Sequence, residues 1–145
     1  MPVTVKQISL WRKEIEHQVG TLATTLEPVA KAGGKLQVLM GYRYSGEGAK
    51  GAVEVYPIAG KKVVAAAAEA GLSAATFPVL LVEGDDKPGL GFAIAQAIAG
   101  AGISMSFFVA QVIGRKFSAV LGFETEADAK TSAPLIKKAA AGKKK

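Results

Sequence analysis

The sequence repeats itself after 69 residues, and this repeat limits the folds that are open to the chain. The interval is the distance from Gly20 to Gly89, and the same interval separates Gly33 from Gly102. It also relates two alternating apolar runs, which are Leu36, Val38 and Met40 in the first copy and Met105, Phe107 and Val109 in the second. A fixed spacing of this kind indicates that one structural unit occurs twice. The 145 residues are therefore expected to form two small units of similar fold.

Within each copy, the hydrophobic pattern predicts a strand, a helix, a hairpin of two strands and a second helix. In the first copy the predicted elements are Val3 to Trp11, Gly20 to Ala32, Leu36 to Met40, Ala52 to Tyr56 and Gly60 to Ala70, with a charged loop from Arg12 to Gln18. In the second copy they are Phe77 to Val82, Leu90 to Ala101, Ile103 to Val112, Phe117 to Phe123 and a last helix from Glu124 to about Ala140. Ala52-Val53 and Ala119-Val120 correspond at an interval of 67, because the second hairpin tip is two residues shorter.

This order of elements is the ferredoxin-like βαββαβ pattern, so the predicted fold class is α+β. We expect antiparallel sheets with helices on one face. The alternative is one larger doubly wound sheet, and the hairpin in each copy argues against it. The predicted units are 1–74 and 75–141, followed by a basic tail at 142–145. The closing strand of the first unit would be nearly continuous with the opening strand of the second, and the second unit lacks a convincing closing strand. A sheet that is shared or completed between chains would repair both defects.

The segment from Phe77 to Phe92 is the corner between the first strand and first helix of the second unit. Gly84-Asp85-Asp86 supplies turn residues after the apolar strand. Pro88 suits a first helical turn, and Gly89 lets a backbone approach closely. The first N–H groups of a helix lack partners in the helix and favour anions, so this corner can hold a carboxylate.

The same residues resemble the ACT domain family. The resemblance rests on the turn Asp86-Lys87-Pro88-Gly89-Leu90 and on Ala101-Gly102-Ile103-Ser104, about a dozen residues later. Two such units in a chain of this length are similar to the small stand-alone tandem ACT proteins. The resemblance implies a regulatory protein that is not an enzyme, uses no cofactor or metal, and binds a small molecule such as an amino acid. It also implies pairing of units, within a chain or in a homodimer, with the ligand at the interface.

The resemblance also implies which residues bind the ligand. On one side they are the turn residues Asp85, Asp86, Lys87, Pro88, Gly89 and Leu90, and on the other, from a partner unit, Ile103, Ser104 and Met105. The first unit departs from the motif, with Val19 in place of proline and Lys35 in place of serine. Its weaker site would comprise His17, Gln18, Val19, Gly20 and Lys35. Either this site is structural or its ligand differs.

The composition indicates which binding partners and which cellular compartment to expect. The net charge is +6, but the excess gathers at the end, in Lys137, Lys138, Lys143, Lys144 and Lys145. A solvated terminus explains these lysines. The sequence lacks the interleaved aromatic and basic residues of an RNA-binding sheet, so we do not expect nucleic-acid binding. No stretch is long and apolar enough to predict a membrane span, and charged residues between Lys6 and Glu16 argue against a signal peptide. The absence of cysteine agrees with a cytoplasmic location.

Two other functions remain open on the sequence alone. The chain could be a scaffold whose sheets serve only oligomerisation, or a small ferredoxin-like enzyme. Adjacent carboxylates such as Asp85 and Asp86 can act as an acid–base pair, but no further cluster of histidine or carboxylate residues accompanies them. Tyr42, Arg43 and Tyr44 form an aromatic and basic cluster that fits either an edge strand or ligand contacts.

Overall fold

The computed structural model describes residues 3–16, 18–46 and 48–142, and the chain divides into two compact units. One unit, here called the N-terminal unit, is Ser9–Thr76. The other, here called the C-terminal unit, joins Met1–Ile8 to Phe77–Lys145. The predicted division into 1–74 and 75–141 differs from this one for residues 3–8, which pair with the sheet of the C-terminal unit.

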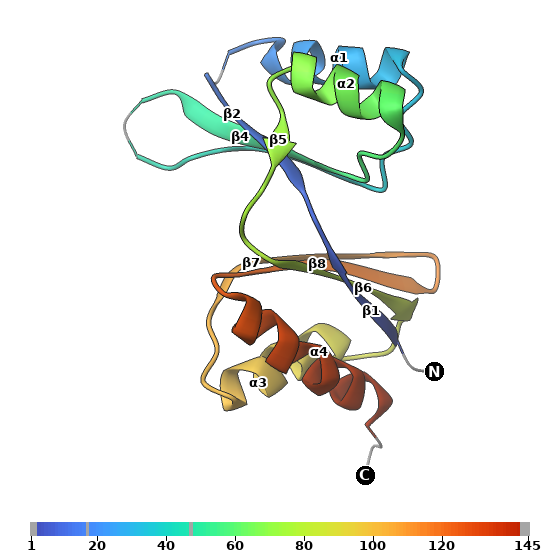
Figure 1. Cartoon of the computed structure of the whole chain (residues 1–145). Coiled ribbons are helices and arrows are strands. Elements are labelled where there is room, and N and C mark those ends of the chain that lie inside the picture. The colour runs from blue at the N-terminus through green and yellow to red at the C-terminus, as the bar shows by residue number, and fades with distance from the viewer. Residues whose placement is uncertain (1–2, 17, 47, 143–145) are drawn as a thin grey trace. The chain divides into compact units, whose positions relative to one another are not determined.

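The C-terminal unit is a four-stranded antiparallel sheet with two helices on one face (Figure 1). Its elements are β6 (Val79–Asp85), α3 (Leu90–Gly100), β7 (Met105–Ile113), β8 (Lys116–Phe123), α4 (Glu126–Ala141) and β1 (Val3–Ile8). The strand order is β1-β6-β8-β7. The N-terminal strand β1 therefore lies at the position of the closing strand, next to β6.

The core of the C-terminal unit lies between the sheet and its helices. Leu90, Ile94 and Ile98 recur every four residues along α3 and are buried against β6 and β8. The last helix begins at Thr125, whose hydroxyl accepts the Asp128 N–H at 3.0 Å as an N-cap. Ile136 and Ala140 complete the same core from α4.

The N-terminal unit repeats this architecture with its own sheet and two helices on one face (Figure 1). Its elements are β2 (Trp11–Glu16), α1 (Thr21–Lys31), β3 (Val38–Arg43), β4 (Lys50–Tyr56), α2 (Lys61–Glu69) and β5 (Ser73–Ala74). The strand order β3-β4-β2-β5 corresponds to that of the other unit, with the two-residue β5 as the closing strand. Val29, Val53, Val55 and Ala67 form its core.

The first copy contains the main error of the secondary-structure prediction. The strand predicted from Val3 to Trp11 ends at Ile8, and a second strand, β2, begins at Trp11 and occupies most of the predicted loop from Arg12 to Gln18. The charges of β2 do not exclude a strand, because Arg12, Glu14 and Glu16 alternate with Trp11, Lys13 and Ile15, and the outer charges find polar partners. Trp11 and Ile15 pack on the core, while Arg12 lies opposite Glu54 and Glu16 opposite Lys50.

The backbone confirms the interval of 69 residues in detail. Helices α1 and α3 have the same length, and their first residues, Thr21 and Leu90, are 69 apart. Each follows a glycine in the left-handed region, with φ of 89° at Gly20 and 78° at Gly89. The turns make equivalent hydrogen bonds, from Thr21 N–H to the Gln18 carbonyl and from Leu90 N–H to the Lys87 carbonyl, both at 3.2 Å. The predicted pair of α+β units is therefore confirmed.

Candidate functional site

The corner at Gly89 is held by both backbone and core contacts. The Ala93 N–H donates to the Gly89 carbonyl at 2.9 Å, and Leu90 anchors the first helical turn because its side chain is buried. Within the described residues, no protein acceptor takes the N–H groups of Gly91 and Phe92. These two amides are available to an anion, as predicted for the start of a helix.

The acidic residues of this turn have different surroundings. Asp85 accepts a hydrogen bond and ion pair from Lys116 Nζ at 2.6 Å, which lowers the pKa of the Asp85 carboxyl. The Asp86 backbone N–H donates to the Arg115 carbonyl at 2.8 Å, while its exposed carboxylate makes no contact of this kind with the described residues. Lys87 Nζ donates to the Gly142 carbonyl at 3.4 Å. Asp86 is therefore the carboxylate of the turn that is available to a ligand.

The other half of the predicted site lies beyond the far end of α3. Ile103, Ser104 and Met105 follow this 11-residue helix, whose length is about 16 Å. Ile103 and Met105 pack on the core, and Ser104 is exposed. A single unit therefore does not bring the turn and these three residues together. Lys35 and the Gln18–Gly20 turn are separated by α1 in the same way.

The corner at Gly20 has the same backbone form but a different lining. Gln18, Val19 and Gly20 make the turn, Val19 is fully exposed, and the Thr24 N–H donates to the Gly20 carbonyl at 3.0 Å. Within the described residues, no protein acceptor takes the N–H groups of Leu22 and Ala23. His17, which the sequence placed in this weaker site, lies outside the described residues.

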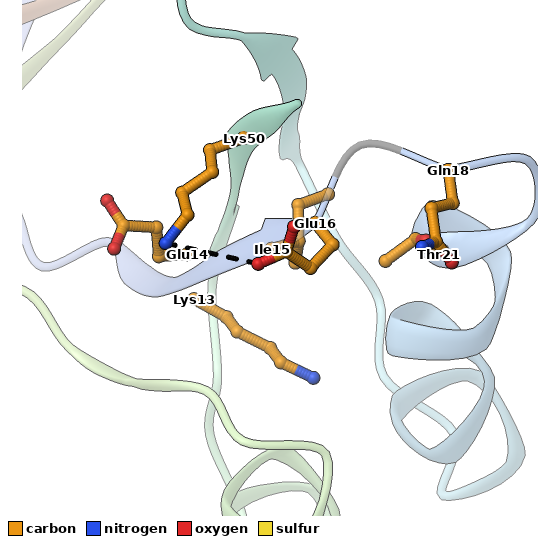
Figure 2. A pocket seen from close by; sticks show the side chains of 7 residues that line it. All are labelled: Lys13, Glu14, Ile15, Glu16, Gln18, Thr21 and Lys50. Carbon is orange, nitrogen blue, oxygen red and sulfur yellow. Dashed lines mark ion pairs between the residues drawn. The ribbon is translucent and has the colours of Figure 1, made fainter. Parts of the chain in front are cut away.

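A pocket of about 380 Å³ lies at this corner of the N-terminal unit (Figure 2). It is lined by Lys13, Glu14, Ile15, Glu16, Gln18, Thr21 and Lys50. Lys50 Nζ lies 3.9 Å from Glu16 Oε2, so these two opposite charges pair on the wall. Gln18 is the only residue of the predicted weaker site among the described lining residues. The pocket has the size of a site for a small metabolite.

Lys13 is a lining residue that the sequence interpretation missed. It lies between Trp11 and Ile15 on the helix-covered face of β2 and opposite the buried Val53. The interval of 69 places it at the position of Val82, which is fully buried in the C-terminal unit. A lysine that replaces a core valine in a repeat was the available signal, and reading the segment as a loop concealed it.

A second polar cluster occupies the opposite face of the same sheet. The Tyr42 hydroxyl donates to Glu54 Oε2, and Arg12 Nε lies 3.7 Å from the same oxygen. Glu54 is 1% exposed, and its Oε1 has no partner among the described residues. The Tyr44 hydroxyl accepts from Arg12 and donates to Glu14 at 2.9 Å. Burial and the bond to Glu54 raise the pKa of Tyr42 to about 12, so its hydroxyl stays protonated as the donor.

Removing the hydroxyl of Tyr42 is expected to destabilise the N-terminal unit. Tyr42→Phe leaves the buried Glu54 carboxylate without its donor, which should cost about 2 kcal/mol of unfolding free energy. Tyr44→Phe is the matched control, because its acceptor Glu14 is exposed, and it should cost about 1 kcal/mol or less. Urea unfolding followed by the fluorescence of Trp11, the one tryptophan of the chain, measures both. Equal losses would contradict the importance of burial at Glu54.

The described residues were also searched for a metal site and for membrane-spanning helices. No three carboxylate or histidine side chains among residues 3–16, 18–46 and 48–142 are grouped as ligands for a metal ion. None of the helices in these ranges combines the length and apolar content needed to cross a bilayer. The described pocket and the two corners therefore remain the features on which a functional proposal can be based.

Several solved structures share the fold of this chain. No protein-family model matches the sequence, and no curated protein matches it. Among solved structures, protein BT0572 from Bacteroides thetaiotaomicron has a TM-score of 0.67 at 14% identity, covering 90% of this chain and 87% of that one. The regulatory subunit of aspartate kinase from Thermus thermophilus has a TM-score of 0.62 at 13% identity, covering 96% and 97%.

A whole enzyme also contains this fold as one part. Aspartate kinase from Clostridium acetobutylicum, described as an allosteric enzyme, has a TM-score of 0.56 at 13% identity and covers 94% of this chain but 33% of its own. At these identities the likeness concerns the fold. It agrees with the fold of two ferredoxin-like α+β units that the sequence predicted, and a fold of this kind occurs in that regulatory subunit and in that allosteric enzyme.

Proposed function

We propose that this protein is a non-catalytic regulatory module that binds an amino acid or a related small metabolite. The observation that carries the proposal is the pocket at the Gly20 corner, where charged side chains of both signs and Thr21, the first residue of α1, line a space of about 380 Å³. A free amino acid has one charge of each sign at neutral pH. Its carboxylate would lie at the start of α1, with the amides of Leu22 and Ala23.

The pocket also offers groups for the rest of such a ligand. The carboxylates of Glu14 and Glu16 can accept from the ligand's ammonium group, and the Gln18 amide can donate or accept. Ile15 supplies an apolar contact for a side chain.

We further propose that the Gly89 corner forms a second site when two units pair. Asp85, Asp86, Lys87, Pro88, Gly89 and Leu90 would contact one side of the ligand, and Ile103, Ser104 and Met105 of a partner unit would contact the other. The edge strand β7 supports pairing, because its outer positions Val109, Val112 and Ile113 are 48–68% exposed. Long apolar edge strands readily pair with another chain.

Charge on this edge is expected to prevent dimer formation. The double variant Val109→Lys and Val112→Lys places like charges where two β7 edges would meet, and the fold should tolerate it because both positions are about half exposed. The mass measured by light scattering after gel filtration should fall from that of a dimer to that of a monomer. Val64→Lys, on the exposed side of α2, is the control and should leave the dimer intact. A dimer that persists in the double variant would exclude this edge.

A thermal-shift screen with the twenty amino acids tests the proposed function. A ligand that binds only the native state raises the melting temperature, by an amount that grows with its concentration relative to Kd. At least one amino acid at millimolar concentration should produce such a shift. If none does, and the protein still forms a dimer through β7, the scaffold function is favoured instead.

A further inference from the structure

We propose that one edge of β2 in the N-terminal unit is a docking site for an extended segment of a partner protein, which would add a strand to the sheet. This inference goes beyond the proposed function, because it concerns a protein partner and does not depend on a bound small molecule. It begins from the two-residue strand β5, which pairs only with Trp11 and Arg12. The other residues of β2, 13–16, pair with β4 on one side, and no described strand pairs with them on the other.

The C-terminal unit shows that a strand fits an edge of this kind. The interval of 69 relates residues 13–15 of β2 to residues 82–84 of β6. In β6 these residues are paired with β1, where Val5, Thr4 and Val3 lie opposite residues 82, 83 and 84. The short strand β5 occupies only the positions that correspond to residues 6 and 7 of β1. Among the described residues of the N-terminal unit, nothing corresponds to residues 3–5 of β1.

The free edge presents the backbone groups of Glu14 and Glu16. The Ala75 N–H donates to the Leu10 carbonyl at 2.8 Å, so the backbone of Leu10 faces the side on which β5 lies. Successive residues of a strand direct their N–H and C=O groups to opposite sides, so every second residue after Leu10 faces this side too. Edge groups of this kind are a template for pairing with another chain.

The pairing of β2 with β4 gives the same direction. The Tyr44 N–H donates to the Lys50 carbonyl at 2.8 Å, so the even-numbered residues of β4 face β3. The odd-numbered residues of β4 then face β2, where they lie opposite Lys13 and Ile15. The bonds between β2 and β4 therefore do not use the backbone groups of residues 14 and 16, and an added strand would leave these bonds intact.

The edge is also accessible. All four of its residues, 13–16, line the pocket of about 380 Å³ (Figure 2). Neighbouring side chains of a strand point to opposite faces of the sheet, so a space lined by four successive residues adjoins the backbone of the strand. Glu14 and Glu16 are themselves exposed. A partner segment can therefore reach the backbone groups that the edge presents.

The side chains beside the edge indicate the chemistry of the segment. Ile15 packs on the core of the unit, so an apolar residue should lie opposite it, as Val3 does at the corresponding place in the C-terminal unit. On the other face, the carboxylates of Glu14 and Glu16 favour basic residues opposite them. The salt bridge from Lys50 to Glu16 is exposed and 3.9 Å long, so it competes weakly. The expected segment has an apolar residue between two basic ones.

The same edge of a second copy is a less suitable occupant. Two antiparallel β2 strands would have to bring together residues that face the edge, which are Glu14 and Glu16. Each register that pairs Glu14 with a residue of the other free edge therefore places a glutamate opposite a glutamate. Like charges in directly opposite positions destabilise a strand pair. A segment of different sequence avoids this repulsion.

Amide hydrogen exchange in the wild-type chain tests whether the edge is free. The Phe123 N–H donates to the Pro78 carbonyl at 3.0 Å, so by the same alternation Glu83 faces β1. The amides of Glu14 and Glu16 should exchange at least about tenfold faster than the amide of Glu83, which occupies the filled edge. Equal protection of the three amides would overturn the inference. Protection that grows with protein concentration would also overturn it, because a second copy would then occupy the edge.

A synthetic peptide tests the docking itself. The peptide acetyl-Lys-Val-Lys-Thr-amide, which has an apolar residue between two basic ones, is titrated at millimolar concentration into the full chain labelled with ¹⁵N. At about ten times its Kd, the exchange of the Glu14 and Glu16 amides should slow about tenfold, because only the unbound fraction exchanges. The peptide acetyl-Glu-Val-Glu-Thr-amide is the matched control and should bind at least about tenfold more weakly. Saturation without slower exchange at these two amides would contradict docking on this edge.

Two variants separate backbone pairing from charge. Glu14→Pro removes an N–H from the free edge and none of the bonds to β4, so it should abolish peptide binding in a folded chain. Glu14→Gln keeps the N–H and should reduce binding by less than about tenfold. Equal binding by Glu14→Pro and wild type would overturn the inference, and if Glu14→Pro does not fold, the exchange measurements on the wild type decide. A failed screen with amino acids would count against the proposed function alone.

Discussion

Removal of residues 1–8 is expected to unfold the C-terminal unit and to leave the N-terminal unit folded. Strand β1 pairs with β6 along its whole length, from Val3 opposite Gly84 to Ile8 opposite Val79. Its loss removes Val3 and Val5 from the core and exposes an apolar central strand as a new edge. Burial of the side chains of Val3, Val5 and Ile8 contributes about 4–8 kcal/mol, which approaches the whole stability of a small domain.

The two units can be followed separately in this experiment. Trp11 lies in the N-terminal unit, so its fluorescence should keep the cooperative unfolding transition of the full chain. Amide resonances of residues 79–123 should lose their dispersion in a heteronuclear NMR spectrum. Val3→Asp should weaken the same unit, whereas Lys6→Asp, an exposed position on the same strand, should not. A dispersed spectrum in the truncated chain would show that β1 is dispensable.

A negative charge at Gly20 is expected to abolish ligand binding in the N-terminal unit. Gly20 precedes the free amides of α1, and a Cβ there would meet no atom within 4 Å, so an added side chain is directed into open space. Two like charges about 4 Å apart repel by roughly 4 kcal/mol near a protein surface. Gly20→Asp should therefore weaken binding of a carboxylate ligand by about two to three powers of ten.

Uncharged and equivalent variants separate charge from backbone strain. Gly20 has φ of 89°, a conformation that asparagine and aspartate tolerate to a similar degree, so Gly20→Asn is the control for strain. Gly89→Asp and Gly89→Asn make the same comparison at the equivalent corner. Calorimetry with the amino acid found in the thermal-shift screen measures all four variants. Equal binding by Gly20→Asp and wild type would place the ligand elsewhere.

The repeat and the helix ends were predictable because they depend on local sequence. Gly20 and Gly89 begin helices in the left-handed conformation that glycine favours, and Gly33 and Gly102 follow the helix ends in the same conformation. The corner at Gly89 was identified from its turn residues, and the structure places it between β6 and α3 as expected.

Strand β2 was missed because its charges are satisfied by residues distant in sequence. Arg12 lies opposite Glu54, and Tyr44 reaches Glu14 from the following strand, so only the folded sheet makes this segment a favourable strand. Subtracting 69 from the last six positions of β6 gives the bounds of β2, so the repeat indicates this strand. The run of charges indicates a loop instead, and that prediction was wrong. No local pattern predicts that β1 pairs with the sheet of the C-terminal unit. This pairing depends on which sheet has an open edge.

The functional residues also fall into those that local sequence predicts and those that depend on the folded unit. The turn residues carry a motif, whereas the pocket was found at the corner whose motif is less well preserved. Glu54 was read as an ordinary strand residue, although a carboxylate inside the apolar run from Ala52 to Tyr56 indicates a polar cluster. The surroundings of Lys13 and Glu54 depend on how the whole unit packs, so local sequence does not reveal them.

The location of a bound amino acid tests the central claim most directly. Uniformly ¹⁵N-labelled protein is titrated with the amino acid that gives the largest thermal shift, and changes in amide chemical shift are mapped on the sequence. The account predicts saturable changes at Leu22 and Ala23, with changes at Ile15 and Thr21, which line the pocket. A titration that saturates while these four amides remain unperturbed would contradict it.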